Sequence, residues 1–153
     1  MQPDRERARG AAGGGGGRLS DFALFASLDP ASLDELTNAA RLRSWAAGSL
    51  IFSRGDAGDH MLAIRAGRIR LSLSSARGRE IVLQTLGPGD ILGEMALLDG
   101  APRSADATAV QETTCLVLPR QSFEAVAARR PDVGLALARH LCGHLRRTNF
   151  QME

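Results

Sequence analysis

The part of the chain best suited to binding an anion is residues 92–105, which read LGEMALLDGAPRSA. This pattern predicts a short helical turn at about residues 95–98, directly behind Gly93 and Glu94. Free backbone N–H groups at the start of a helix attract an anion, and glycine allows close approach to the backbone. We therefore expect a negatively charged group to bind near Gly93.

Two side chains of the same segment could bind a phosphate and a sugar. Arg103 can grip a phosphate through two parallel hydrogen bonds, and Ser104 adds a hydroxyl beside it. Glu94 cannot favour a phosphate, but its carboxylate can accept a hydrogen bond from a sugar hydroxyl. One arginine with a few amides suits a singly charged cyclic phosphodiester better than a triphosphate, which usually brings Mg²⁺ and a lysine. The alternative is a surface ion pair between Glu94 and Arg103.

The composition indicates one globular domain that has no strongly charged partner. The chain has 153 residues, no lysine and a formal net charge of +2. Four of its arginines lie in the first eighteen residues, so the remainder is nearly neutral and a basic nucleic-acid-binding face is not expected. No apolar run reaches transmembrane length, which predicts a cytoplasmic protein without membrane contact. Cys115 and Cys142 suit reduced thiols better than a disulfide framework or a zinc site.

The elements that must position these groups follow from glycines, prolines and apolar spacing. Residues 1–18, with five consecutive glycines, predict a disordered arm, and residues 19–153 predict the folded domain. Asp29 and Pro30 are typical of a helix start, and a helix is expected over residues 30–41.

Helical spacing returns after Pro119 and predicts helices over residues 120–129 and from 131 to about 150. Much of the apolar stripe on the last helix is interpreted as a dimer seam. Its members are Val133, Leu137, Leu141, Leu145 and Thr148.

Residues 42–118 have the pattern of a β-rich core. Short apolar runs alternate with glycine-bearing turns, and residues 69–73 alternate cleanly between apolar and polar side chains. The predicted fold class is α+β, mainly β. It is an antiparallel β-roll, jelly-roll-like, flanked by N-terminal helices and a long C-terminal helix.

Residues 92–105 resemble the phosphate-binding cassette of the cyclic-nucleotide-binding family, which reads Phe-Gly-Glu-Leu-Ala-Leu, a short gap, then Pro-Arg-Ala/Ser/Thr-Ala. The family includes the catabolite activator protein, regulatory subunits of cyclic-AMP-dependent protein kinase and nucleotide-gated channels. The resemblance covers about residues 22–150, with Leu92 in place of the usual Phe. It implies that Gly93 and Glu94 give backbone amides to the cyclic phosphate, that Glu94 binds the ribose 2′-hydroxyl and that Arg103 pairs with the phosphate. The implied ligand-binding set also includes Met95, Ser104 and Ala105.

The C-terminal helix resembles that of the catabolite activator group, the Crp/Fnr-type regulators. Thr148 and Asn149 match the Thr-Ser pair of that group, which contacts adenine with one residue from each subunit, so a homodimer through this helix is implied. Fraying polar residues at a helix end would explain them equally well. Family regulators continue into a helix-turn-helix, so the chain ending at Glu153 is interpreted as an excised sensor domain. Contact with DNA is expected only through that missing domain.

Several alternatives remain open. Ser104, where relatives that favour cyclic GMP often have Thr, leans towards cyclic AMP, although cyclic GMP is possible. The chain could instead be a stand-alone module acting on a protein partner, or could sense a cyclic dinucleotide or haem. A cupin-type metal enzyme would need a His-x-His pair, which is absent, and His140 and His144 have no third ligand in view. We therefore expect no catalytic residues, no metal and no cofactor.

Overall fold

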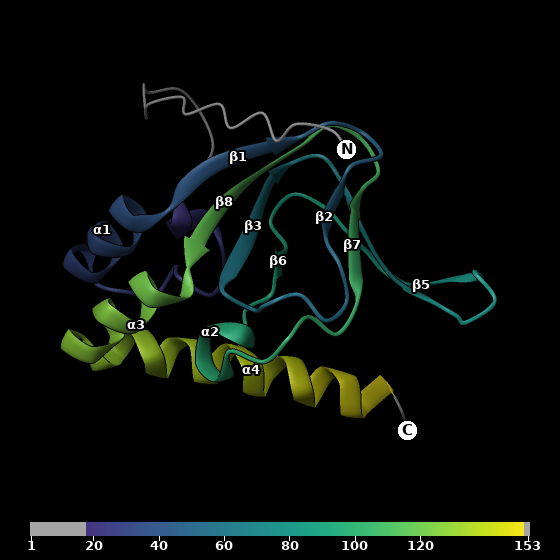
Figure 1. Ribbon diagram of the computed structural model, residues 1–153. Helices are drawn as coiled ribbons and strands as arrows, with labels where there is room; N and C mark the ends of the chain where they lie inside the picture. The colour runs from purple at the N-terminus through teal and green to yellow at the C-terminus, as the bar shows by residue number, and fades with distance from the viewer. Residues whose placement is uncertain (1–17, 152–153) are drawn as a thin grey trace.

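The computed structural model describes residues 18–151, with side chains described as far as Arg147 (Figure 1). Within this range a 3-10 turn, η1 (Leu19–Asp21), and helix α1 (Pro30–Ala39) precede the strands. Helices α3 (Arg120–Arg129) and α4 (Pro131–Gln151) follow them. Of the expected N-terminal arm, residues 1–18, only Arg18 is among the described residues.

The described strands form two four-stranded antiparallel sheets. One sheet has the order β1–β8–β3–β6 and the other β2–β7–β4–β5. Their bounds are β1 (Arg41–Trp45), β2 (Leu50–Phe52), β3 (His60–Ala66), β4 (Ile69–Ser74), β5 (Glu80–Leu86), β6 (Ile91–Leu92), β7 (Asp106–Ala109) and β8 (Thr113–Pro119). A short helix, α2 (Ala96–Asp99), interrupts the β pattern between β6 and β7. The prediction of a β-roll flanked by helices, with a long helix at the C-terminus, is confirmed.

Strand β3 separates two apolar cores. Its side chains alternate, so Leu62 and Ile64 point into the roll, while Met61 and Ala63 point towards the helices. The core on the helical side, here called the helical core, draws a buried side chain from every α-helix. These are Leu36 of α1, Leu97 of α2, Phe123 and Val126 of α3, and Val133 and Leu137 of α4.

The helices begin at the predicted prolines and capping residues, but α1 ends at Ala39 rather than at residue 41, where β1 begins. Asp29 caps α1 as predicted, because its Oδ1 accepts a hydrogen bond of 2.7 Å from the backbone N–H of Ser32. Helix α3 has the predicted bounds, and Pro131 separates it from α4. The cassette helix lies one residue later than expected, beginning at Ala96.

The interpretation of the α4 stripe as a dimer seam is wrong for its first half. Val133 and Leu137 are fully buried against the chain's own helical core, and Leu141 packs at its edge. Leu145 is 61% exposed, whereas the side chain of Thr148 lies outside the described residues. Val133 and Leu137 are therefore not available for contact with a second copy.

Candidate functional site

Two glycines direct the chain out of the roll and back into it. Gly93 follows β6 with φ +78°, and Gly100 ends α2 with φ +62°, both in the left-handed region that favours glycine. Between them α2 is anchored by Leu97, which is buried in the helical core. The chain then returns through Pro102 to Arg103 at the entrance to β7.

Arg103 is held in place by backbone groups of the loop between β2 and β3. Its N–H donates to the carbonyl of Asp56 at 2.9 Å, and its own carbonyl accepts from Gly55 at 2.8 Å. Its side-chain Nη2 donates to the carbonyl of His60 at 2.6 Å. The guanidinium also lies over the ring of Phe52, 4.4 Å from the ring centre. The position of the guanidinium is therefore fixed from several sides.

The guanidinium of Arg103 is buried without enough partners. Only 6% of the residue is exposed, and Nε and Nη1 have no hydrogen-bond partner among the described residues. Burial lowers the pKa of Arg103 from its ordinary value, and the carboxylates of Asp59 and Asp56 oppose that shift. A buried cation with two unused donors is costly unless an anion accepts from them. The geometry is therefore suited to binding a group with two acceptor oxygens, such as a phosphate.

Gly93 allows this arrangement because it has no side chain. A Cβ at this position would meet Nη1 of Arg103 and would lie 3.1 Å from the carbonyl oxygen of His60. The structure thus brings together the predicted residues Gly93 and Arg103, which are distant by ten positions in the sequence. Any anion on Nη1 would also be close to the backbone that leads into α2.

The other predicted site residues differ in exposure. Glu94 is half-buried, and the described part of the chain contains no ion pair between Glu94 and Arg103. Ser104 is exposed, Met95 is 61% exposed, and Ala105 is buried, so Ala105 can offer only backbone groups. The side chains of Thr148 and Asn149 lie outside the described residues, and their contact with a base stays a prediction.

His60 and Asp59 contribute to the site in a way that the sequence does not reveal. His60 begins β3, and its carbonyl holds Arg103. Its Nδ1 donates to Oδ1 of Asp59 at 2.6 Å. Burial lowers the pKa of His60 below its ordinary value, and the hydrogen bond to Asp59 only partly opposes this. No sequence signal marks His60, because the group that acts is a backbone carbonyl.

Gln84 of β5 is a second residue that sequence patterning missed. The strand register pairs Ile69 with Leu86 and Leu71 with Gln84, so Gln84 shares the inward face of the roll with these apolar side chains. Its own side chain remains exposed. The same cross-strand row runs from Gln84 through Leu71 and Ala107 to Phe52, beneath Arg103. Gln84 therefore lies on the same face of this sheet as Leu71, Ala107 and Phe52.

Two classes of site find no support in the described residues. No group of three or more His, Cys, Asp or Glu side chains there could hold a metal ion. Among the same residues, no helix is both long enough and apolar enough to cross a membrane.

Comparison with known proteins gives consistent matches. The family model described as "Cyclic nucleotide-binding domain" matches residues 42–130. The "Cyclic AMP receptor protein" of Thermus thermophilus is 36% identical over 130 residues, which are 85% of this chain and 60% of that protein. The "CRP-like cAMP-activated global transcriptional regulator" of Mycobacterium tuberculosis is 30% identical over 131 residues, 86% of this chain and 58% of that protein. The chain thus spans about three fifths of these relatives.

Solved structures agree with the sequence matches. The N-terminal domain of a transcriptional regulator from Streptomyces coelicolor A3(2) superposes with a TM-score of 0.76 at 34% identity, covering 90% of this chain and 96% of that one. The catabolite activator protein of Thermus thermophilus gives 0.74 at 36% identity, covering 85% and 61%. A match to Glutaminase 2 of Bradyrhizobium diazoefficiens covers only 20% of that protein and so reflects a shared domain. With the cassette, the roll and these matches in agreement, the chain belongs to the cyclic nucleotide-binding domain family.

Proposed function

We propose that this chain is a sensing module that binds cyclic AMP and reports it through α4. The observation that carries the proposal is the buried guanidinium of Arg103, which has two unused donors beside Gly93. A cyclic phosphate has one negative charge and two exocyclic oxygens, which can accept from the unpartnered Nε and Nη1 of one guanidinium. No catalytic step is part of the proposal.

The remaining contacts follow from the chemistry of the ligand. Glu94, half-buried two residues before α2, accepts the ribose 2′-hydroxyl. The backbone at Gly93 and Glu94 and the hydroxyl of Ser104 complete the phosphate contacts. Met95, Ala105, Thr148 and Asn149 remain in the proposed set as contacts of the ligand's other surfaces. Cyclic AMP is favoured over cyclic GMP because Ser104 follows the arginine and because the relatives named above are cyclic AMP regulators by name.

The proposed output is a dimeric regulator. Four exposed residues of α4 follow heptad a and d spacing, namely Leu135, Ala138, Cys142 and Leu145. This row, here called the α4 seam, lies on a different face from Val133 and Leu137. A parallel pair of α4 helices would bury it. The matched relatives are longer than this chain, so we place DNA binding in a further domain beyond it.

A calorimetric titration of the folded chain with cyclic AMP and with cyclic GMP tests the proposal. We expect cyclic AMP to bind more tightly, and Arg103→Ala to weaken binding by about tenfold or more, since a charged hydrogen bond contributes ~1.5–3 kcal/mol. Arg41→Ala is the matched control, because Arg41 is exposed on β1. Circular dichroism checks that each variant is folded. Absence of heat with both nucleotides, or equal affinity in Arg103→Ala and wild type, would overturn the proposal.

A further inference from the structure

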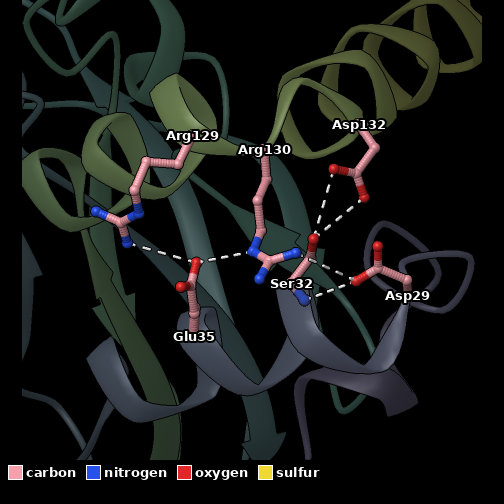
Figure 2. A network of polar contacts seen from close by, with 6 residues as sticks. All are labelled: Asp29, Ser32, Glu35, Arg129, Arg130 and Asp132. Carbon is pink, nitrogen blue, oxygen red and sulfur yellow. Dashed lines mark hydrogen bonds and ion pairs between the residues drawn. The ribbon is translucent and has the colours of Figure 1, made fainter.

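A cluster of polar side chains joins α1 to the junction of α3 and α4. Figure 2 shows its six members, here called the polar clamp: Asp29, Ser32, Glu35, Arg129, Arg130 and Asp132. The three members near α1 recur every three residues, so they share one face of that helix. The other three surround the break between α3 and α4. The clamp therefore connects segments about a hundred residues apart in the sequence.

Glu35 is the centre of the clamp. Its Oε2 accepts a hydrogen bond of 3.0 Å from Nε of Arg130 and lies 3.4 Å from Nη2 of Arg129. Burial raises the pKa of Glu35, but the hydrogen bond from Arg130 and the charge of Arg129 outweigh it and leave the pKa below its ordinary value. One carboxylate thus holds the end of α3 through two cations.

Ser32 extends the clamp to α4. Its hydroxyl is fully buried and donates to the carboxylate of Asp132, at 3.2 Å to Oδ2 and 3.4 Å to Oδ1. Asp29, which caps α1, lies 4.0 Å from Nη1 of Arg130. As Figure 2 shows, α1 therefore contacts the last turn of α3 and the first turn of α4 at once.

The junction itself is a break in the helical backbone. Arg130 has φ −131° and ψ 87°, outside the helical region, because the following Pro131 disfavours helical geometry at the residue before it. Regular helix hydrogen bonds therefore do not fix the angle between α3 and α4. Packing of Val133, Leu137 and Leu141 against the helical core fixes that angle, together with the polar clamp.

The clamp is suited to opening and closing. The side chains of Glu35 and Arg130 are 35% and 32% exposed, and that of Arg129 is 61% exposed. Half-exposed ion pairs exchange their partners for water at little cost, unlike the buried apolar contacts beneath them. Breaking the clamp would leave the helical core assembled and would remove one of the two restraints on the angle of α4.

We propose that the polar clamp, centred on Glu35, sets the angle at which α4 leaves α3 and so adjusts the nucleotide response. The link to nucleotide rests on the function proposed above, in which α4 carries the signal. If the angle of α4 differs between free and bound protein, breaking the clamp must change nucleotide affinity. By linkage, nucleotide binding must then change the equilibrium between the closed and open clamp by the same factor.

Hydrogen exchange of the full chain tests the clamp without any ligand. In Glu35→Gln we expect amides of residues 132–137 to exchange about threefold faster, the size typical of a half-exposed ion-pair network. Arg130→Gln should have the same effect, and the double variant should add little to either one. Glu124→Gln is the matched control, because Glu124 pairs with Arg120 within α3 and does not cross the junction. Unchanged exchange in Glu35→Gln would overturn the proposal that the clamp restrains α4.

Calorimetry with cyclic AMP tests the link to the ligand. We expect the affinity of Glu35→Gln to differ about threefold from wild type, and that of Glu124→Gln to match it. Equal affinity in Glu35→Gln and wild type would overturn the link, and the clamp would then be structural only. A wild-type chain that binds no cyclic nucleotide would overturn the proposed function and the link together, whereas the exchange experiment would still decide the clamp.

Discussion

At the scale of single residues, Gly93 carries two requirements at once. Its φ of +78° disfavours a side chain, and a Cβ there would meet Nη1 of Arg103. For Gly93→Ala we expect a loss of about 1–2 kcal/mol in the free energy of unfolding, from left-handed backbone strain. We also expect nucleotide affinity to fall about tenfold, because the guanidinium must move away from the backbone. Urea denaturation and calorimetry measure the two effects.

Gly48→Ala is the control that distinguishes backbone strain from contact with Arg103. It has φ +83°, but a Cβ there would meet no atom within 4 Å. Gly48→Ala should therefore lose stability to a similar degree and keep its nucleotide affinity. An equal loss of affinity in both variants would mean that strain alone, and not contact with Arg103, explains the effect of Gly93→Ala.

Residue type and spacing predicted that Gly93 and Arg103 act together, and the structure places them side by side. The sequence could not identify the groups that hold Arg103. His60 acts through a carbonyl, which every residue has, and Phe52 has the same residue type as other buried side chains of the chain. Such supporting contacts depend on which strands become neighbours, and that is decided by the fold.

At the scale of elements, α2 is too short to be stable alone, since an isolated helix needs about 12–15 residues. Leu97 anchors it in the helical core, whereas the adjacent Leu98 is 48% exposed. For Leu97→Ala we expect the free energy of unfolding to fall by about 2–5 kcal/mol, with weaker nucleotide binding because α2 positions Gly93. Leu98→Ala should stay within about 0.5 kcal/mol of wild type. Similar urea midpoints for the two variants would contradict this anchoring role.

The elements that were predicted well are those bounded by strong local signals. Pro119 and Pro131 fixed α3, and Asp29 with Pro30 fixed the start of α1. Strand β7 carried no such signal, because Asp106–Ala109 has weak intrinsic preference for strand and is stabilised by pairing with β2 and β4. The irregular register between β4 and β5 was equally hidden, and it falls between Leu71 and Ser72.

At the scale of the whole molecule, α4 has two apolar faces with different uses. Helical periodicity alone joined Val133, Leu137 and Leu145 into one stripe, since a straight helix of 3.6 residues per turn drifts relative to a spacing of four. The structure assigns the first two to the helical core and leaves the α4 seam exposed. Which face was already covered by the chain itself could be learned only from the fold.

The α4 seam leads to a prediction about the oligomeric state of the chain. If two copies pair along it, Leu145→Glu should place like charges across the seam and shift the chain from dimer to monomer in sedimentation equilibrium. Arg147→Glu is the control, because Arg147 is exposed on the opposite side of the same helix.

In a parallel pair, the exposed Cys142 of each copy would face its counterpart, so mild oxidation should link wild type covalently, but not Leu145→Glu. A monomer at every concentration, or a dimer that Leu145→Glu leaves intact, would exclude this seam. Any nucleotide signal would then have to leave the domain through the α3–α4 junction rather than through paired helices.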